Sequence, residues 1–487
     1  MASRTENESV SGPVAHWIAG SRVDPSDGGT FSTFNPADGT VLAEVAHGGA
    51  ADVDRAVSAA REALSGPWAR LSPAARSGLM WRLADLLEAR GDELAELESL
   101  DNGKPLSAAH GDVKAAAAHL RYFAGWPTKI EGEVIPVSRP DMHVYTRKEP
   151  VGVCGQIVPW NFPLVMAVWK IAPVLATGCT AVLKPAEQTP LSALRLGELA
   201  AEVGIPDGVV NVVAGDGVTG AALVDHPGVD KIAFTGSTAV GREIGARCGR
   251  ALKRVTLELG GKSPNIILPD ADLDAAVAGA YRGIYYNAGQ ACNAGSRLFV
   301  QRAQYDEVVT RLAEKASATR VGPGLAPDTE VGPLVSAEQR ARVLGYIEAG
   351  RADGAEVVAG GSAIEPVPGG YYVEPTLFAG VADDMRVARE EIFGPVLVAL
   401  PYDELEEVAA RANDTEFGLA AGVWTRDVAN AHRVAALLQA GNVYVNCWGT
   451  GDPAAPFGGY KASGIGREKG HANLDAYLEI KTVHVQL

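Results

Sequence analysis

Apolar residues recur at helical spacing near the start of the chain. Val53 to Leu64 and Ala74 to Leu100 place them three and four positions apart, with charged residues between them. This periodicity predicts amphipathic helices, because it gathers the apolar side chains on one face. We expect both segments to serve packing.

Short β-branched runs alternate with helical segments further along the chain. Between Val151 and Leu259 the predicted strands are Val153–Val158, Thr180–Lys184, Val209–Val213, Lys231–Phe234 and Val255–Leu257. After Gly260 a second alternation predicts strands at Asn265–Leu268, Leu298–Gln301, Ala355–Val358, Val396–Leu400, Gly422–Thr425 and Asn442–Val445. This order is typical of mainly parallel sheets with crossover helices, so we expect two α/β domains.

Two extended segments do not fit either alternation. Ile130 to Lys148 is hydrophobic and charged by turns and contains turn residues, and Ala476 to Val485 alternates like an edge strand. We expect the two to pair outside both sheets and to form a subunit contact in a homodimer or homotetramer. The alternative is a flap that serves only its own chain.

Composition narrows the class of protein. A chain of 487 residues with 47% hydrophobic residues is globular and long enough for two or three domains. The formal charge of -16 argues against nucleic acid or an anionic membrane as the main partner. An acidic, solvated surface is the favoured explanation of this charge.

Compartment and membrane signals point to the cytoplasm. The cysteines are odd in number and scattered, so we expect reduced thiols: Cys154, Cys179, Cys248, Cys292 and Cys447. Met1 to Gly12 is polar and lacks the apolar core of a secretory signal, which predicts a frayed tail. The most apolar stretch, Leu164 to Leu183, is interrupted by Lys170, Pro173 and Gly178, so no transmembrane segment is expected.

The strongest chemical signal is a cysteine among small residues. Cys292 stands in Gly289-Gln290-Ala291-Cys292-Asn293-Ala294-Gly295, and upstream Glu258 stands in Leu257-Glu258-Leu259-Gly260-Gly261-Lys262. A nucleophilic thiol needs access to an electrophile, and its covalent intermediate needs a base that activates water. Taken alone, Cys292 is as easily explained as buried filler.

Polar residues at predicted strand ends add to this signal. In Pro159-Trp160-Asn161-Phe162-Pro163, the Asn161 amide could donate to an oxyanion, although an N-cap is the commoner role. Lys184 and Glu187 could hold a ribose, and the carboxylate would repel a 2′-phosphate, favouring NAD over NADP. The alternative for this pair is a surface salt bridge.

Two further motifs are weaker by themselves. The turn Thr235-Gly236-Ser237 precedes a predicted helix whose free N–H groups could bind a pyrophosphate, but the G-x-G-x-x-G fingerprint is absent. In Glu390-Glu391-Ile392-Phe393, a carboxylate could bind a ribose beside an aromatic ring. An ordinary capped helix and a charged loop are the respective alternatives.

Together these motifs resemble the NAD(P)-dependent aldehyde dehydrogenase superfamily. The shared motifs are Pro-Trp-Asn-Phe-Pro, Lys-Pro-Ala-Glu, Phe-Thr-Gly-Ser, Leu-Glu-Leu-Gly-Gly-Lys, Gly-Gln-x-Cys-x-Ala-Gly, Glu-Glu-Ile-Phe-Gly-Pro and Pro-Phe-Gly-Gly-Tyr-Lys-x-Ser-Gly. They follow the family order over nearly the whole chain. The resemblance implies a Rossmann-type, five-stranded NAD-binding domain (1–129 and 151–258), an α/β catalytic domain (259–470) and a small β oligomerisation flap (130–150 and 471–487).

The resemblance also implies a mechanism. The Cys292 thiolate adds to an aldehyde, Asn161 and the Cys292 backbone N–H stabilise the oxyanion, and hydride passes to NAD. Glu258 then activates the water that cleaves the thioester. CoA-acylating relatives usually lack this carboxylate, so Glu258 favours a free carboxylic acid as product.

By the same resemblance, further residues surround the cofactor and the substrate. Lys184 and Glu187 bind the adenosine ribose, Ser237 the pyrophosphate and Glu391 the nicotinamide ribose, with Phe393 beside it. The groove is lined by Ile157, Trp160 and Gly236, and Lys170 either organises the site or snorkels to the surface.

An aromatic tunnel for an apolar or cationic aldehyde is expected from Phe162, Met166, Trp169, Tyr286 and Phe457. Core packing is the equal alternative for each of these side chains. The segment Trp448-Gly449-Thr450-Gly451-Asp452 departs from relatives that act on retinal or acetaldehyde, which carry another aromatic residue there. Betaine aldehyde-type relatives favour tryptophan where Phe457 stands.

Three other readings have less support. A thiol hydrolase would want a histidine near Cys292, and none of the nine histidines lies in these motifs. A catalytically idle binding protein is disfavoured by the intact Cys292, Glu258 and Asn161. No Cys/His/carboxylate cluster in the sequence has metal-ligand spacing.

Overall fold

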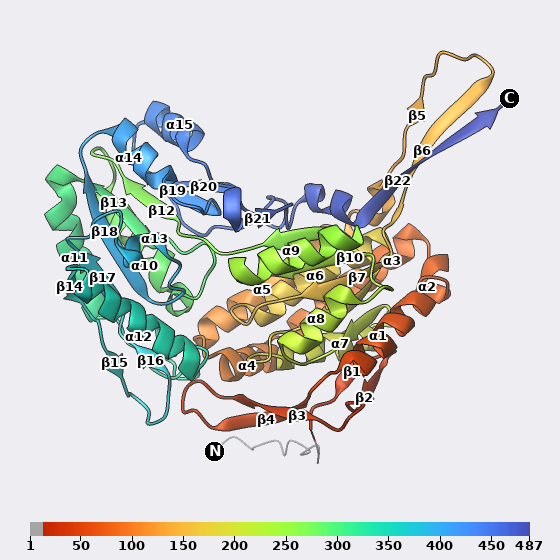
Figure 1. Cartoon of the computed structure of the whole chain (residues 1–487), viewed down its shortest axis with the longest axis horizontal. Coiled ribbons are helices and arrows are strands. Elements are labelled where there is room, and N and C mark those ends of the chain that lie inside the picture. Colours follow the sequence, from red (N-terminus) through yellow and green to blue (C-terminus); the bar gives the residue numbers. More distant parts are fainter. Residues whose placement is uncertain (1–12) are drawn as a thin grey trace.

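Two mainly parallel sheets covered by helices, with a projecting β-arm, make up residues 13–487, the part of the chain that the structure describes (Figure 1). In this computed structural model the segment Met1–Gly12 lies outside the described residues, and with it the expected frayed tail. The predicted α/β class, with two sheets and a small separate β element, is confirmed. Among the described residues, no helix is long and apolar enough to cross a membrane.

The larger sheet has eight strands in the order β2-β1-β9-β8-β7-β10-β11-β21. They are β1 (His16–Ile18), β2 (Ser21–Val23), β7 (Val153–Ile157), β8 (Thr180–Lys184), β9 (Val210–Val212), β10 (Lys231–Thr235), β11 (Arg254–Glu258) and β21 (Gly464–Ile465). The five from β9 to β11 are parallel, and the other three extend them by antiparallel pairing. All five predicted strands of this region are present, with ends within one residue of the expected positions.

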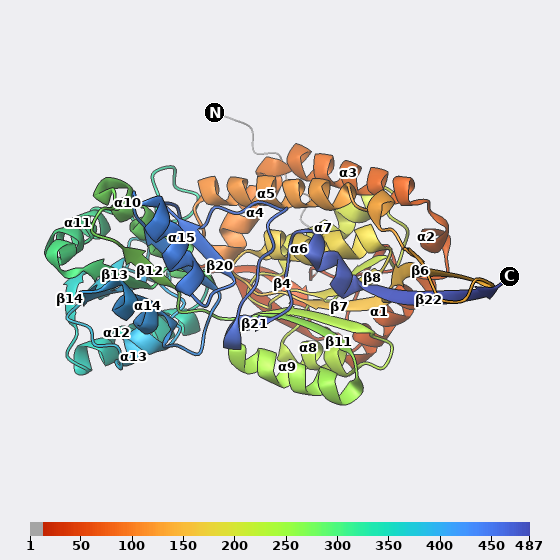
Figure 2. The same cartoon turned by 90° about the horizontal axis from the view of Figure 1, so that it is seen from above.

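Helices cover both faces of this sheet, and strands β7 to β10 are therefore buried along their whole length (Figure 2). One face carries α3 (Pro73–Ala89), α4 (Gly91–Asn102), α5 (Leu106–Ala124), α6 (Pro163–Thr177) and α7 (Leu191–Glu202). The other carries α1 (Ala50–Ala63), α8 (Gly217–Asp225) and α9 (Thr238–Ala251). The helical segment expected from Ala74 to Leu100 is two helices, because the backbone leaves the helical region at Arg90, where the weak helix former Gly91 follows.

The second sheet has seven strands in the order β14-β17-β18-β13-β12-β19-β20. They are β12 (Pro264–Ile267), β13 (Arg297–Gln301), β14 (Glu356–Ala359), β17 (Thr376–Ala379), β18 (Val396–Tyr402), β19 (Ala420–Trp424) and β20 (Asn442–Val445). Its helices are α10 (Leu273–Tyr285), α11 (Tyr305–Ser317), α12 (Ala337–Ala352), α13 (Arg386–Arg389), α14 (Leu405–Asn413) and α15 (Val428–Leu437). Six of these strands were predicted to within two residues, and β17 was not predicted.

The arm is a three-stranded antiparallel sheet that projects from the body of the molecule (Figure 1). It consists of β5 (Val134–Ile135), β6 (Met142–Pro150) and the C-terminal β22 (Leu478–Gln486). β22 pairs with β6 along its whole length, so the predicted pairing of the two extended segments is confirmed.

Smaller elements complete the chain. An N-terminal hairpin of β3 (Thr30–Phe34) and β4 (Val41–Ala46), a second of β15 (Ala363–Ile364) and β16 (Tyr372–Val373), and helix α2 (Pro67–Arg70) were not predicted. Strand β21 lies within the range 259–470 yet pairs with β11 of the first sheet. The chain after β20 therefore returns to the first sheet before it enters the arm.

Candidate active site

The polar residues of the sequence motifs gather at the carboxyl ends of the parallel strands of the first sheet. Trp160 and Asn161 follow β7, whereas Lys184, Thr235 and Glu258 are the last residues of β8, β10 and β11. The sheet order runs from β7 to β8 and β9 in one direction and to β10 and β11 in the other. The ends of β7 and β10 therefore form a topological switch point, where open α/β sheets bind ligands.

An unusual backbone presents Cys292. Asn287, Ala288 and Gly289 are all left-handed, with φ of 51°, 53° and 71°. A Cβ on Gly289 would lie 2.0 Å from the carbonyl oxygen of Gly394, so only glycine fits there. The turn directs the following residues back toward the first sheet, and Cys292 lines the cleft there with its side chain partly exposed.

Asn161 is tied to the same turn. Its Nδ2 donates to the carbonyl of Gln290 at 3.0 Å, and its own carbonyl accepts from Asn287 Nδ2 at 2.9 Å. The first bond uses one of the two amide protons, so the other remains available to a ligand. The N-cap of α6 is Phe162, and the capping alternative for Asn161 is therefore wrong.

Glu258 is buried at the end of β11. Its side chain is 2% exposed, and neither oxygen has a hydrogen-bond partner in the described structure. Burial, together with the charges of Glu468 and Glu391 and against the opposing charge of Lys170, raises the pKa of Glu258 to about 8. A carboxyl group with this pKa is suited to proton transfer near neutral pH.

The Cys292 thiol lies in the field of the same carboxylates. Burial raises its pKa, and Glu258 and Glu391 raise it further. The thiol is therefore neutral at pH 7 and needs a base to remove its proton. Glu258 and Glu391 both line the cleft with pKa values near neutrality, but Glu391 is engaged by Gly261 N, whereas both oxygens of Glu258 are without a hydrogen-bond partner in the described structure.

A buried ion pair lies behind Glu258. Lys170 Nζ contacts Glu468 Oε1 at 2.5 Å, and the two side chains are 0% and 3% exposed. Lys170 is thus no snorkelling surface residue, and that alternative is wrong. Glu468 Oε2 has no partner in the described structure, so the pair retains hydrogen-bonding capacity close to Glu258.

The cleft around Cys292 has a volume of about 750 Å³. Several predicted residues line it: Trp160, Asn161, Met166, Gly236, Ser237, Glu258, Cys292, Glu391 and Phe393. Ser237 is the N-cap of α9, so the free N–H groups of that helix face the cleft. The Phe393 ring packs edge-on against Trp160 with centroids 5.2 Å apart.

Glu391 bonds to the main chain. Its Oε1 accepts from Gly261 N at 2.9 Å, and burial raises its pKa to about 7. A Cβ on Gly260 would lie 2.3 Å from Glu391 Oε2, which explains the glycine pair after Glu258. Gln339 and Arg342 of α12 also line the cleft, and no sequence motif pointed to them.

A second groove, of about 1120 Å³, contains Glu187. Lys184 Nζ lies 3.3 Å from Glu187 Oε2. Ala337 and Glu338 of α12 line this groove, whereas Gln339 lines the cleft, so the start of one helix borders both. Ile157 lines neither cavity, because its side chain is 7% exposed and packs in the core.

On its other side Cys292 borders a tunnel of about 1080 Å³. All five predicted tunnel residues line it: Phe162, Met166, Trp169, Tyr286 and Phe457. The ring centroids of Trp169 and Phe457 are 5.5 Å apart, and the Phe162 ring stacks on the Tyr286 ring with centroids 6.2 Å apart.

Sequence reasoning missed other tunnel residues, among them His119, Arg282, Tyr444 and Lys469. Trp448, from the glycine-rich departure, is 7% exposed and fills a slot between glycines of α10, of β19 and of the loop before β13. A Cβ would lie 3.0 Å or less from its indole at Gly283, Gly295 and Gly422. These glycines lie far apart in the sequence, so no local sequence pattern could have predicted the slot that they form for Trp448.

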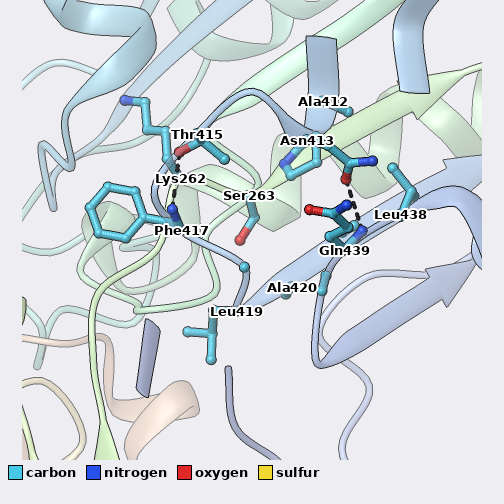
Figure 3. A pocket seen from close by; sticks show the side chains of 14 residues that line it. Lys262, Ser263, Ala412, Asn413, Thr415, Phe417, Leu419, Ala420, Leu438 and Gln439 are labelled. Atoms are coloured by element: carbon cyan, nitrogen blue, oxygen red, sulfur yellow. Dashed lines mark hydrogen bonds between the residues drawn. The ribbon is translucent and has the colours of Figure 1, made fainter. Parts of the chain in front are cut away.

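A small separate pocket of about 240 Å³ lies behind the glycine pair (Figure 3). The segment from Asn413 to Leu419 lines one side of it, and Lys262 and Ser263 line another. Lys262 Nζ and Ser263 Oγ are buried without a hydrogen-bond partner in the described residues. Across residues 13–487, no cluster of three metal-ligating side chains occurs.

Comparison with known proteins agrees with this geometry. The model of the aldehyde dehydrogenase family matches residues 23–483. The chain is 50% identical over 463 residues to the human mitochondrial aldehyde dehydrogenase, covering 94% of this chain and 89% of that protein. Human retinal dehydrogenase 2 is 50% identical over 465 residues, with the same two coverages.

A solved NAD+ complex of the aldehyde dehydrogenase from Bacillus cereus is 53% identical to the chain. It superposes with a TM-score of 0.96 and covers 98% of this chain and 97% of that one. Fold and sequence thus agree over nearly the whole length, and the chain belongs to the aldehyde dehydrogenase family.

Proposed function

We propose that the protein oxidises an aldehyde to the carboxylic acid with NAD as the hydride acceptor. One observation carries this proposal: Cys292 lines both the cleft at the sheet switch point and the aromatic tunnel. A sulfur at this junction has access to a dinucleotide on one side and a small carbonyl compound on the other. Family membership and the NAD+ complex of the Bacillus cereus relative support the assignment.

The residues around the cleft fit NAD. The start of α9, capped by Ser237, offers free N–H groups to a pyrophosphate. Glu187 lines the adjoining groove and pairs with Lys184, so the two suit a ribose, and the negative charge of Glu187 disfavours a 2′-phosphate. Glu391 and Phe393 would flank the nicotinamide ribose, beside Trp160. When bound, NAD supplies the acceptor for the hydride.

The chain's own residues perform the remaining steps. Cys292 sulfur bonds to the aldehyde carbon after Glu258 has taken the thiol proton. The free N–H of Asn161 and the Cys292 backbone N–H stabilise the oxyanion. After hydride transfer Glu258 releases the thiol proton to solvent. It then removes a proton from water, whose oxygen attacks the thioester carbon; the C–S bond breaks, and the Cys292 thiolate takes up a proton as the acid is released.

We infer the assembly and compartment from weaker observations. The arm supports a homodimer or homotetramer, and free cysteines at all five positions support a reducing cytoplasm. We retain the proposed division into an NAD-binding domain (1–129 and 151–258), a catalytic domain (259–470) and an oligomerisation element (130–150 and 471–487), with β21 crossing between the first two.

Substitution of the nucleophile tests the proposal. Cys292→Ala should abolish NADH formation from any aldehyde, while NAD binding measured by calorimetry persists, because the cofactor contacts are left in place. Cys447→Ala serves as the matched control, since Cys447 lines neither the cleft nor the tunnel. Undiminished turnover by Cys292→Ala, or no turnover by the wild type with any aldehyde of a broad panel, would overturn the assignment.

A further inference from the structure

Lys469 is a charged side chain of the tunnel that has no ion-pair partner in the described structure. Lys469 is 5% exposed and lines the cavity that Cys292 also lines. In the described structure no carboxylate lies within salt-bridge distance of its amine, although the protein carries a net charge of -16. The Lys469 side chain is largely buried, and an ammonium that is partly desolvated without a counterion is costly.

Aromatic rings and a glycine loop hold the Lys469 amine at the tunnel wall. Nζ lies 5.0 Å from the centroid of the Trp169 ring and 5.6 Å from that of Phe457. A Cβ on Gly451 would lie 3.2 Å from the same nitrogen, so the absence of a side chain there leaves the amine uncovered. The glycine-rich departure after Cys447 thus makes room for a cation.

The other ionisable groups around the tunnel do not neutralise this charge. Asp112 contacts Lys104 at 2.5 Å, and burial lowers the pKa of His119 to about 4, so this histidine is neutral. Arg282 lies over Tyr286, with 6.0 Å from Cζ to the ring centroid, and forms no ion pair in the described structure. Asp452 favours the charged form of Lys469 but lies too far away for a salt bridge.

We propose that Lys469 is an anion subsite and that the physiological substrate is an aldehyde with a carboxylate at its far end, an ω-oxo carboxylic acid. The aldehyde carbon reaches Cys292 while the carboxylate pairs with the Lys469 amine between Trp169 and Phe457. Arg282 adds a second positive charge for the same ligand. The same charges disfavour a quaternary-ammonium aldehyde, which the aromatic residues alone would have admitted. This inference rests on the proposed function.

The test uses ω-oxo carboxylic acids of increasing chain length, each paired with its uncharged methyl ester. For each pair, kcat/KM is measured from NADH formation by the wild-type protein. For at least one chain length, the acid should exceed its ester by about 10- to 100-fold, the effect of one charge-assisted contact in a partly buried site. Esters oxidised as well as acids at every length would overturn the subsite but leave the proposed function intact. No oxidation of either would instead defeat the proposed function.

Lys469 variants separate charge from packing. Lys469→Met should lower the acid-to-ester ratio of kcat/KM by at least about 10-fold, and Lys469→Arg should retain the preference for the acid. A purely structural role would change both members of a pair equally. The control Lys129→Met removes an exposed lysine whose amine lies 5.9 Å from the Trp126 ring, outside the tunnel, and should keep the wild-type ratio. A ratio that survives Lys469→Met would refute the proposal.

Discussion

At the scale of single residues, the protonation state of Glu258 sets the pace of the proposed hydrolysis. Burial raises its pKa to about 8, so the protonated form dominates at neutral pH. Only the deprotonated form can accept a proton from water. We therefore expect thioester hydrolysis, followed in pre-steady-state experiments, to accelerate as the pH rises and to level off above about 8.

Glu258→Gln removes this base. The variant should form its first NADH more slowly, because Cys292 then lacks its base, and should turn over at least about 100-fold more slowly in the steady state, without the rise toward alkaline pH. Glu365→Gln, at an exposed glutamate remote from the cleft, is the control and should behave like the wild type. A variant that keeps the wild-type pH profile would exclude Glu258 as the hydrolytic base.

Burial lowers the pKa of Lys262, whereas it raises that of Glu258, because it disfavours the charged form of each group. The Lys262 side chain is 1% exposed, and burial together with Arg297 lowers its pKa to about 7, against the pull of Glu391 and Glu390. The unfolded chain has a lysine pKa of about 10.4, so below pH ~7 both states hold the proton and the folded state bears the full penalty. The penalty fades as the pH rises from about 7 to about 10.4, because only the unfolded state stays protonated there.

Lys262→Met should therefore raise the free energy of unfolding by a few kcal/mol at pH 6 and by little at pH 10, which denaturant titrations at several pH values can measure. Lys461 provides the contrast, because its exposed amine donates to the carbonyls of Asn413 and Thr415 at 2.7 and 3.3 Å. Lys461→Met removes these two hydrogen bonds and should therefore lower the free energy of unfolding modestly throughout the neutral pH range. A Lys262→Met variant less stable than the wild type at pH 6 would contradict the argument.

At the scale of elements, the end of β8 governs the choice of cofactor. Glu187 follows this strand and faces the groove proposed for the adenosine ribose. Glu187→Ser removes the charge that repels a 2′-phosphate, so the ratio of kcat/KM with NADP to that with NAD should rise by about 10-fold. Glu202→Ser, at an exposed position on α7, should leave the ratio as it was. No shift in the first variant would remove Glu187 from the ribose site.

Buried parallel strands were the elements that sequence predicted best. β8 is buried along its whole length and was located to the residue, and so was β20, whose side chains are only partly buried. The three-residue strands β1 and β2 were missed, because so short a run carries no periodicity. Local motifs likewise located Cys292 and Glu258, whose neighbours are glycines for reasons of close approach.

Long-range contacts mark the limit of such prediction. The sequence around Lys469 indicates neither its burial nor the two rings beside it, because Trp169 belongs to α6, far away in the chain. The place of Ile157 in the cofactor groove stays a prediction. It lies one residue from the cofactor loop, and its side chain packs in the core of the first sheet.

At the scale of the whole molecule, the site depends on a segment that joins the two sheets. After β20 the chain passes between them, where Ser463 Oγ donates to Gly260 O at 2.6 Å and accepts from Gly418 N at 2.9 Å. The same segment then contributes Glu468 and Lys469. It continues from β21 into β22 of the arm (Figure 2). Glu258 and its neighbours are therefore held by both halves of the molecule and by the start of the arm.

The arm itself is too thin to be stable without further burial. Its sheet has only three strands, β22 leaves one edge unpaired, and Val134 and Ile480 are 70% and 69% exposed. Exposed apolar side chains on an open edge are typical of a surface that pairs with another chain.

Ile480→Glu should therefore shift the molecular mass measured by light scattering from that of an oligomer to that of a single chain. Leu252→Glu, at an apolar residue that is 92% exposed on the body, should leave the oligomer intact. A wild-type protein that runs as a single chain, or an Ile480→Glu variant that stays oligomeric, would show that the arm serves only its own chain.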